Sequence, residues 1–165
     1  MAVDMFLKID GVEGESRDAK HKGEIDLLSF SWGITNSGRS SGGGGGAGKV
    51  TPGDFSIVKA LDKATPQLFE RCCEGTHVPA VQLTLSTTSG KETQQEYLKI
   101  KLTDVLISSY QTGGSSGGGG IPVESLSFSF NSVEISAADR KGNFVSQVNC
   151  NFGSRDGGGI AHEHD

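Results

Sequence analysis

The sequence predicts an all-β fold, a closed or nearly closed β-barrel of two sheets with one short flanking α-helix at about residues 66–74. Three observations lead to this fold class. Apolar and polar residues alternate over most of the chain, which is the period of strands. In three long strands the apolar phase shifts by one residue midway, which suits sheets that coil strongly and close. One segment, residues 66–74, has the start and stop signals of a helix.

Strands are predicted in chain order from this alternation. The first spans Val3 to Ile9, and the second runs from about Glu24 to Ile34. Two further long strands are centred on Thr103-Asp104 and Asn131-Ser132, and shorter strands are predicted at about 54–60, 80–88 and 144–152. In the second strand the apolar residues before Leu28 lie on one face and those from Leu28 to Trp32 lie on the other. The other two long strands shift in the same way, which indicates a bulge or a change of sheet.

The helix is predicted from its ends and from its apolar stripe. Thr65 is the expected N-cap, and Pro66 occupies the first helical position, where its missing N–H costs nothing. Gly75 follows as a C-terminal stop. The stripe that should pack on the barrel opening consists of Leu68, Phe69 and Cys72.

The length of 165 residues predicts one domain, over residues 1–152, followed by a flexible C-terminal tail over 153–165. The formal net charge of -5 leaves no basic stripe for phosphate groups, so nucleic acid is not an expected partner. No apolar run approaches the roughly 20 residues that span a bilayer, and no signal-peptide pattern opens the chain, so membrane insertion is not expected. The three cysteines are expected to be reduced and to act as small core hydrophobes.

Motifs that look catalytic fall in two glycine-rich blocks, Gly38–Gly48 and Gly113–Gly120, which we interpret as flexible loops. Gly43–Lys49 matches a phosphate-binding loop, but Val50 stands where such a loop needs Ser or Thr. Each block also contains one Gly-x-Ser-x-Gly, the nucleophile elbow of hydrolases, but neither copy precedes a helical pattern. A hydrolase is therefore a weak alternative. The chain is not expected to be an enzyme, and no catalytic residue, cofactor or metal site is predicted.

Several strands have a polar face with few lysine or glutamate side chains. Exposed strands of an isolated monomer are usually protected by charge. An uncharged face is therefore either a plain hydrated surface or a surface that lies against another subunit or lines a water-filled lumen. The residues are Ser29, Ser31, Thr84, Ser86, Ser125, Ser127, Ser129, Gln147, Asn149 and Asn151.

A charged loop and the strand that follows it, over residues 11–33, begin a series of matches to a known family. The matching residues are Gly11, Gly14-Glu15-Ser16, His21, Glu24-Ile25-Asp26, Trp32-Gly33, Asp62–Leu68, Gly75, Tyr97–Leu102, Val105–Ser109 and Glu124–Val133. In order and spacing they resemble the haemolysin co-regulated protein (Hcp) family, the tube protein of bacterial type VI secretion. The resemblance covers about residues 3–135.

The resemblance implies a structural and carrier protein. The family is a β-barrel with a flanking helix, forms hexameric rings that stack into a secreted tube, and acts as a chaperone for effectors held inside the ring. The implied partners are further copies of this chain, type VI effectors, and the spike protein and sheath of the secretion machine. The implied route is from the bacterial cytoplasm through this apparatus, without a cleaved signal peptide.

By analogy with the family, Ser29 and Ser31 are the predicted lumen-facing pair. Contacts between rings or subunits are predicted for two loops, at 10–22 and 38–53. The candidate contact residues are Glu15, Ser16, His21, Gly44, Lys49 and Val50.

His21 has a second interpretation, in which it fixes its own loop by pairing with Glu15 or Glu24. The alternative function for the whole chain is a monomeric β-sandwich binding module that uses the glycine-rich loops as its ligand surface. Solution mass separates the two functions, because a ring has several times the mass of one chain.

Overall fold

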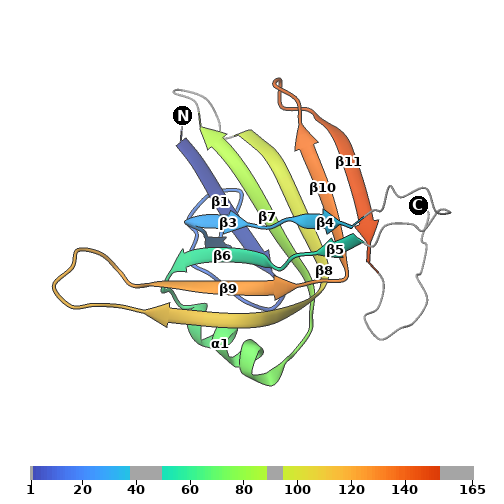
Figure 1. The fold of residues 1–165 in the computed structure, drawn as a ribbon. Coiled ribbons are helices and arrows are strands. Elements are labelled where there is room, and N and C mark those ends of the chain that lie inside the picture. Colours follow the sequence, from blue (N-terminus) through green and yellow to red (C-terminus); the bar gives the residue numbers. More distant parts are fainter. Residues whose placement is uncertain (1, 38–49, 89–94, 153–165) are drawn as a thin grey trace.

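The computed structural model describes residues 2–37, 50–88 and 95–152. Within these ranges the chain forms eleven strands and one helix (Figure 1), which confirms the predicted all-β class with a single helix. The elements are β1 (Ala2–Ile9), β2 (Ile25–Asp26), β3 (Ser29–Ser31), β4 (Ile34–Asn36), β5 (Val50–Pro52), β6 (Phe55–Ala60), α1 (Thr65–Glu74), β7 (Val78–Thr88), β8 (Gln95–Gly113), β9 (Val123–Ser129), β10 (Ser132–Ala138) and β11 (Phe144–Asn151).

The strands form two layers that share the long strand β8. The first layer contains β2, β1, β7, the first half of β8, β10 and β11. The second layer contains the second half of β8, then β9, β6 and β3, and all pairs in both layers are antiparallel. Figure 1 shows the second layer crossing the first at a steep angle, with α1 beneath it. β4 and β5 form a separate two-stranded sheet.

The predicted closure into a barrel is not confirmed. The strand order runs from β2 at one end to β3 at the other, and among the described residues no ladder joins these two strands. Instead, the dipeptide between them crosses from one layer to the other. The N–H of Leu27 donates to the carbonyl of Met5 on β1 (3.0 Å), and the N–H of Leu28 donates to the carbonyl of Val58 on β6 (2.8 Å).

The three predicted phase shifts are the points where the chain changes layer. Leu27-Leu28 separates β2 from β3, and Asn131 lies in the short link between β9 and β10. In β8 the shift falls at Asp104, which has a positive φ of 55°, a conformation that is uncommon outside glycine. The Asp104 carboxylate is held there by the side-chain amide of Asn131 and by His77 Nδ1 (2.8 Å).

The core lies between the two layers, and α1 covers one end of it. The predicted helix is confirmed, with Leu68 fully buried and Gly75 at the C-cap with a φ of 65°. The prediction of Thr65 as the N-cap is wrong, because Ala64 occupies the N-cap position. The N–H of Ala64 donates to the Asp62 carboxylate (2.9 Å). The Thr65 hydroxyl instead accepts the N–H of Asp62 (3.0 Å). The fully buried apolar side chains of the strands include Leu7, Ile25, Phe55, Ile57, Leu83, Ile100, Leu102, Leu126 and Phe128.

Leu28 was predicted on the apolar face of its strand, but it is 57% exposed, because it lies where the chain leaves one layer for the other. Phe69 of the predicted helix stripe packs with its ring edge against Tyr110 of β8 and is 52% exposed.

Two of the cysteines and two of the polar strand residues also depart from expectation. Cys73 and Cys150 are exposed, so they are not core hydrophobes, whereas Cys72 is partly buried and packs against the core as predicted. Thr84 and Ser86 are buried. Thr84 pairs with Phe6 of β1, and the ring of His21 stacks on Phe6, so the segment 10–24 covers this part of the outer face.

Candidate functional site

The loop between β1 and β2, residues 10–24, is a compact element. The N–H of Gly14 donates to the carbonyl of Gly23 (2.7 Å), and the N–H of Ser16 donates to the carbonyl of Glu24 (2.9 Å). A Cβ atom at residue 14 would lie 2.5 Å from the Glu24 carbonyl oxygen, so only glycine fits there. This charged segment, which we call the folded loop, therefore has a defined shape.

His21 fastens the folded loop to the outer face of the first layer. Its ring is buried and stacks on Phe6 of β1, with the two ring centres 4.5 Å apart. Nδ1 lies 3.0 Å from the Glu24 carboxylate, and Nε2 lies 3.1 Å from the Glu96 carboxylate on β8. The predicted pairing with Glu24 is confirmed. Glu96 is a partner that the sequence pattern did not reveal, because it lies 75 positions further along the chain.

A second set of contacts ties the folded loop to the start of α1. The Glu15 carboxylate accepts the N–H of Lys63 (2.7 Å), and the Glu13 carboxylate lies 3.2 Å from the Lys63 ammonium. Both side chains of this ion pair are exposed, so it contributes about 0–1 kcal/mol. Among the predicted contact residues of this loop, Glu15 is exposed, whereas Ser16 and His21 are buried within it.

The second predicted contact loop lies partly outside the described residues, which do not include Gly44 and Lys49. Val50 begins β5 and is 42% exposed. The N–H of Gly53 donates to the carbonyl of Gly33 (2.8 Å), which closes the base of the β4–β5 pair. Val50 is thus presented to solvent by a small sheet with a fixed base.

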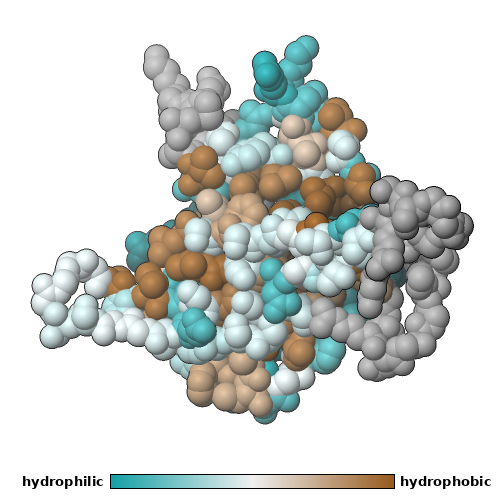
Figure 2. Space-filling model, in the orientation of Figure 1, coloured by the Kyte–Doolittle hydropathy of each residue, from teal (hydrophilic) through white to brown (hydrophobic). Residues whose placement is uncertain are grey.

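Short uncharged side chains cover the outward face of the second layer. The strand register aligns Ser31, Ser56, Ser127 and Ser109 in one row across β3, β6, β9 and β8. On this face the four strands carry no charged residue. Figure 2 shows the area over β3, β6 and β9 as mostly pale, which marks residues between hydrophilic and hydrophobic. We call Ser29, Ser31, Ser56, Ser109, Ser125 and Ser127 the serine face.

The two predicted lumen residues both belong to this face. Ser29 and Ser31 are exposed on β3, at one end of the rows. The hydroxyl groups of Ser56 and Ser127 lie 3.2 Å apart and form a hydrogen bond within the row. The structure therefore brings the predicted pair together with four further serines from distant parts of the sequence.

β11 is an edge strand with no protective charge. It pairs with β10 on one side, and in the described part of the chain no strand pairs with its other side. Its sequence contains no charged residue and no proline, and all of its residues are exposed, including Val145 (68%) and Val148 (59%). Edge strands of monomers usually carry charge, proline or bulges that prevent pairing. An unprotected edge with exposed valines indicates an interaction surface.

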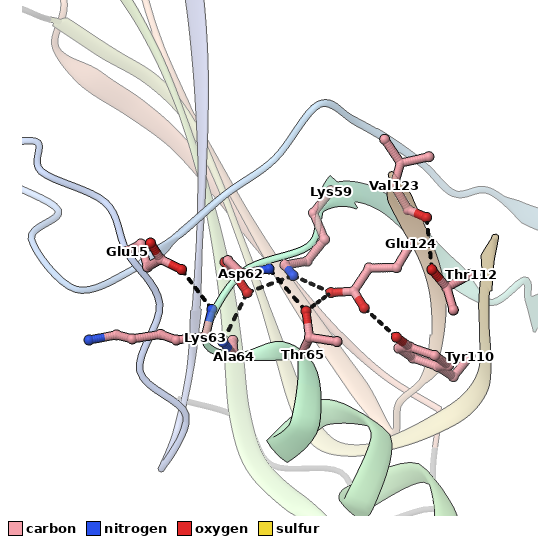
Figure 3. Close-up of polar contacts among 10 residues, drawn as sticks. All are labelled: Glu15, Lys59, Asp62, Lys63, Ala64, Thr65, Tyr110, Thr112, Val123 and Glu124. Carbon is pink, nitrogen blue, oxygen red and sulfur yellow. Dashed lines mark hydrogen bonds and ion pairs between the residues drawn. The ribbon is translucent and has the colours of Figure 1, made fainter. Parts of the chain in front are cut away.

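A buried polar network lies beneath the N-terminus of α1 (Figure 3). Lys59 on β6 and Glu124 on β9 are fully buried and form an ion pair. The Glu124 carboxylate also accepts hydrogen bonds from the hydroxyls of Thr65 (2.8 Å) and Tyr110 (2.5 Å), and the Lys59 ammonium donates to Asp62 (2.8 Å). The network joins three strands of the second layer to the helix, so it fixes the position of α1.

Burial, followed by the hydrogen bond to Glu124, raises the pKa of Tyr110 to about 12. The phenol therefore stays protonated and keeps its role as donor. This network was missed from the sequence, although the alternation contained a signal. Lys59 continues the buried face of Phe55 and Ile57 in β6, a position where an unpaired charge would be too costly.

A cavity of about 410 Å³ opens beside this network, next to the folded loop. It is lined by Glu15, Arg17, Asp26, Ala60, Leu61 and Asp62. Burial, and then the nearby carboxylates of Asp4, Asp62 and Asp18, raise the pKa of Asp26. Among the described residues, no group of His, Cys, Asp and Glu side chains is arranged to hold a metal ion. The one described helix is too short and too polar to cross a membrane.

Comparisons with known proteins agree on one family. Residues 6–136 match the family described as "Type VI secretion system effector, Hcp". The chain is 44% identical over 163 residues to the protein hcp1 of Pseudomonas aeruginosa, covering 98% of this chain and 94% of that protein. The structure of Hcp1 from Salmonella typhimurium superimposes with a TM-score of 0.77 at 34% identity, covering 92% of this chain and 96% of that one. A type VI secretion system effector from Yersinia pestis matches with a TM-score of 0.72 at 34% identity, over 90% and 99% of the two chains.

The fold and these matches define the class as an all-β protein of bacterial type VI secretion. The chain belongs to the Hcp family, the tube proteins of that system. The resemblance predicted from the sequence is therefore confirmed.

Proposed function

We propose that this chain is a structural subunit of the type VI secretion tube. Six copies form a ring, rings stack into a secreted tube, and effectors are carried in the lumen. The observation that carries the proposal is the serine face, which is an outward sheet surface without a charged side chain. Such a surface suits a water-filled lumen, because short neutral side chains leave the passage open and do not trap cargo by charge pairing.

Ring formation is supported by two unlike surfaces at the two ends of the first layer, whose strands follow the order β2, β1, β7, β8, β10 and β11. The unprotected edge of β11 lies at one end. At the other end, Val3 of β1 and Leu28 beside β2 are 47% and 57% exposed. Contact between unlike surfaces of two copies is heterologous, and a rotation that closes turns such contacts into a ring. The number of six subunits comes from the family.

The proposal also covers the barrel, the contact loops, the partners and the route of export. The two layers act as a nearly closed barrel sealed by the Leu27-Leu28 crossing, within one domain over residues 1–152. The folded loop, through Glu15, and the β4–β5 pair, through Val50, contact neighbouring subunits or rings. The tube also meets the spike protein and the sheath, and it leaves the bacterial cytoplasm through the apparatus without a cleaved signal peptide. The protein acts as a carrier and not as an enzyme.

The lumen assignment is tested by replacing Ser31 with glutamine. Ser31→Gln should leave the ring intact and reduce the amount of co-expressed effector that purifies with it, because the longer side chain fills space at the serine face. Thr76→Gln is the matched control, since Thr76 is exposed beyond the end of α1 and away from this face. Light scattering after size exclusion gives the mass, and mass spectrometry quantifies the cargo. Unchanged cargo with Ser31→Gln would remove the lumen assignment.

The same measurement separates the proposal from the alternative of a monomeric β-sandwich binding module. A mass several times that of the chain supports the ring. A single-chain mass at micromolar concentration would overturn the ring and favour the module.

A further inference from the structure

The outward face of the second layer becomes apolar at one end. Figure 2 shows a hydrophobic area at the left of the view, where β6 ends and β9 begins. Beyond the row of four serines, the register forms one row of Ser29, Val58, Ser125 and Gln111 and a last row of Ala60, Val123 and Gly113. Just before β9, Ile121 is 69% exposed, and Val123 is 42% exposed. We call Val58, Ala60, Ile121 and Val123 the apolar end of this face.

The apolar end is spaced like one side of an extended peptide. Successive rows of a sheet face lie two residues apart along each strand, which is about 6.6–7 Å. Alternate side chains of an extended peptide have the same spacing and point to the same side. Apolar groups that gather on a surface mark interaction sites. An extended segment can therefore cover Val58 and Ala60 with two alternate apolar side chains, beside Val123.

The cavity of about 410 Å³ begins where the apolar end stops. Ala60 belongs to both, and the next residue, Leu61, also lines the cavity. The N–H of Leu61 donates to the carbonyl of Pro122 (3.1 Å), so the start of β9 lies against this border. A segment that covers the apolar end therefore brings its following side chains to the opening of the cavity.

The lining of the cavity is acidic. It contains the carboxylates of Glu15, Asp26 and Asp62 and the guanidinium of Arg17. The Asp62 carboxylate contacts the buried ammonium of Lys59 (2.8 Å). The Glu15 carboxylate accepts the backbone N–H of Lys63, whose ammonium pairs with Glu13. Two of the three carboxylates therefore have partners.

Asp26 on β2 is the carboxylate that lacks an opposing charge. The charged groups that act on it are other carboxylates, those of Asp4, Asp62 and Asp18. In the described part of the chain, no cation of the neighbouring segments forms an ion pair with Asp26, and these cations are Lys8, Arg17, Lys20 and Lys22. A cation from a partner would reduce the repulsion among these carboxylates.

We propose that the apolar end and the cavity together bind an extended peptide segment of another protein. In this segment, alternate apolar side chains cover Val58, Ala60 and Val123, and a lysine or arginine on the same side follows them to Asp26. The segment thus has the pattern apolar-x-apolar-x-basic. On the proposed function, and on that alone, the segment belongs to the effectors, and the site selects them by this pattern.

Short labelled peptides test the pattern by fluorescence anisotropy. The probe is Leu-Ser-Leu-Ser-Lys flanked by glycine and serine, and the two comparison peptides replace its lysine with glutamate or both leucines with serine. The probe should bind at least about tenfold more tightly than either comparison peptide, and its advantage over the glutamate peptide should shrink as salt is added. Equal binding of the three peptides, or no binding at about 1 mM probe, would overturn the proposal.

Two variants of the apolar row give opposite results. Val123→Thr keeps the shape and the strand propensity of the residue but removes apolar surface, so the probe should bind about fivefold to tenfold more weakly. Ser125→Val extends the apolar row and should strengthen binding of the probe about threefold. Probe affinity that is the same in both variants would contradict the site.

Asp26→Asn tests the charge. It should weaken binding of the lysine peptide about threefold to fivefold and leave the serine-for-leucine and glutamate peptides no weaker. Glu70→Gln is the matched control, because Glu70 is exposed on α1 and does not line the cavity. Equal losses in Asp26→Asn and Glu70→Gln would reduce the effect to overall charge and overturn the assignment of Asp26.

Solution mass measured on the same samples keeps the two proposals separate. A single-chain mass with the peptide preference intact would remove the ring and retain the site. An intact ring that binds the three peptides equally would retain the proposed function and remove the site. A lower mass of the assembly in Val123→Thr, with unchanged probe affinity, would assign the apolar end to another copy of this chain and also remove the site.

Discussion

The outward faces of the two layers look alike in the sequence and differ in the molecule. Thr84 and Ser86 of the first layer alternate with apolar residues in the same way as Ser125 and Ser127 of the second. Thr84 and Ser86 are nevertheless buried, on the face where His21 of the folded loop stacks on Phe6. In the described part of the chain, Ser29 and Ser31 of the serine face are exposed and its other four serines are partly exposed. Among the described residues, a neutral polar strand face is therefore buried in one layer and open to solvent in the other. Only the solvent-exposed face is therefore a candidate for lining a lumen or contacting a second subunit.

The largest effect on stability is expected when the buried polar network of Lys59 and Glu124, which holds α1 on the second layer, is removed. Lys59→Ala leaves the carboxylate of Glu124 buried without its cation, and we expect a loss of about 3–5 kcal/mol in the free energy of unfolding. Urea unfolding followed by Trp32 fluorescence measures this loss. Lys63→Ala is the control, because its pair with Glu13 is exposed and should cost about 0–1 kcal/mol.

The combined variant Lys59→Met with Glu124→Leu tests whether the loss comes from the unpaired buried charge. It removes both charges and should recover much of the lost stability, since apolar residues of similar volume often replace a buried ion pair without cost. A loss below about 1 kcal/mol for Lys59→Ala alone would contradict the role given to the network.

An intermediate loss of stability is expected when the folded loop is displaced from the outer face of the first layer. In Gly14→Ala the new Cβ atom would lie 2.5 Å from the Glu24 carbonyl oxygen, so the folded loop must shift. We expect a loss of about 1–3 kcal/mol by thermal unfolding, together with faster hydrogen exchange in β1 and β7. Gly33→Ala is the matched control, because a Cβ there meets no atom within 4 Å. Equal effects of the two substitutions would show that the loop does not seal this face.

The smallest effects compare one serine from each layer. The Ser86 hydroxyl is buried and has no hydrogen-bond partner in the described part of the chain, so Ser86→Ala should raise stability by up to about 1 kcal/mol. Ser127→Ala loses the hydrogen bond to Ser56 and should lower stability by a similar amount, up to about 1 kcal/mol. Opposite signs in chemical denaturation would confirm that the two faces differ in cover. Two losses of equal size would argue against it.

Local patterns predicted much of this architecture. The strands, the helix at Thr65–Glu74 and its stop at Gly75 follow from alternation and capping signals. The phase shifts at Leu27-Leu28, Asp104 and Asn131 predicted the changes of layer, because a strand that enters a second sheet must turn its apolar side to the other face.

The rest depended on contacts between distant segments. The partner of His21 on β8, the pairing of Lys59 with Glu124, and the row that joins Ser31 to Ser127 all connect residues that no local period relates. The exposed Cys150 and Leu28 were misassigned for the same reason, since alternation shows which residues share a face and not whether that face is covered.

By itself the sequence determined the all-β class, the single helix, the points where strands change layer and the membership of the Hcp family, because these follow from local period, capping residues and ordered motifs. Only the tertiary structure decided which of the described polar faces are buried, which charges are paired in the interior and which strand lies at the edge of the sheet. The physical reason is that the burial of a strand face depends on which other segments pack against it. Long-range packing determines those segments, and the residues of the face alone do not.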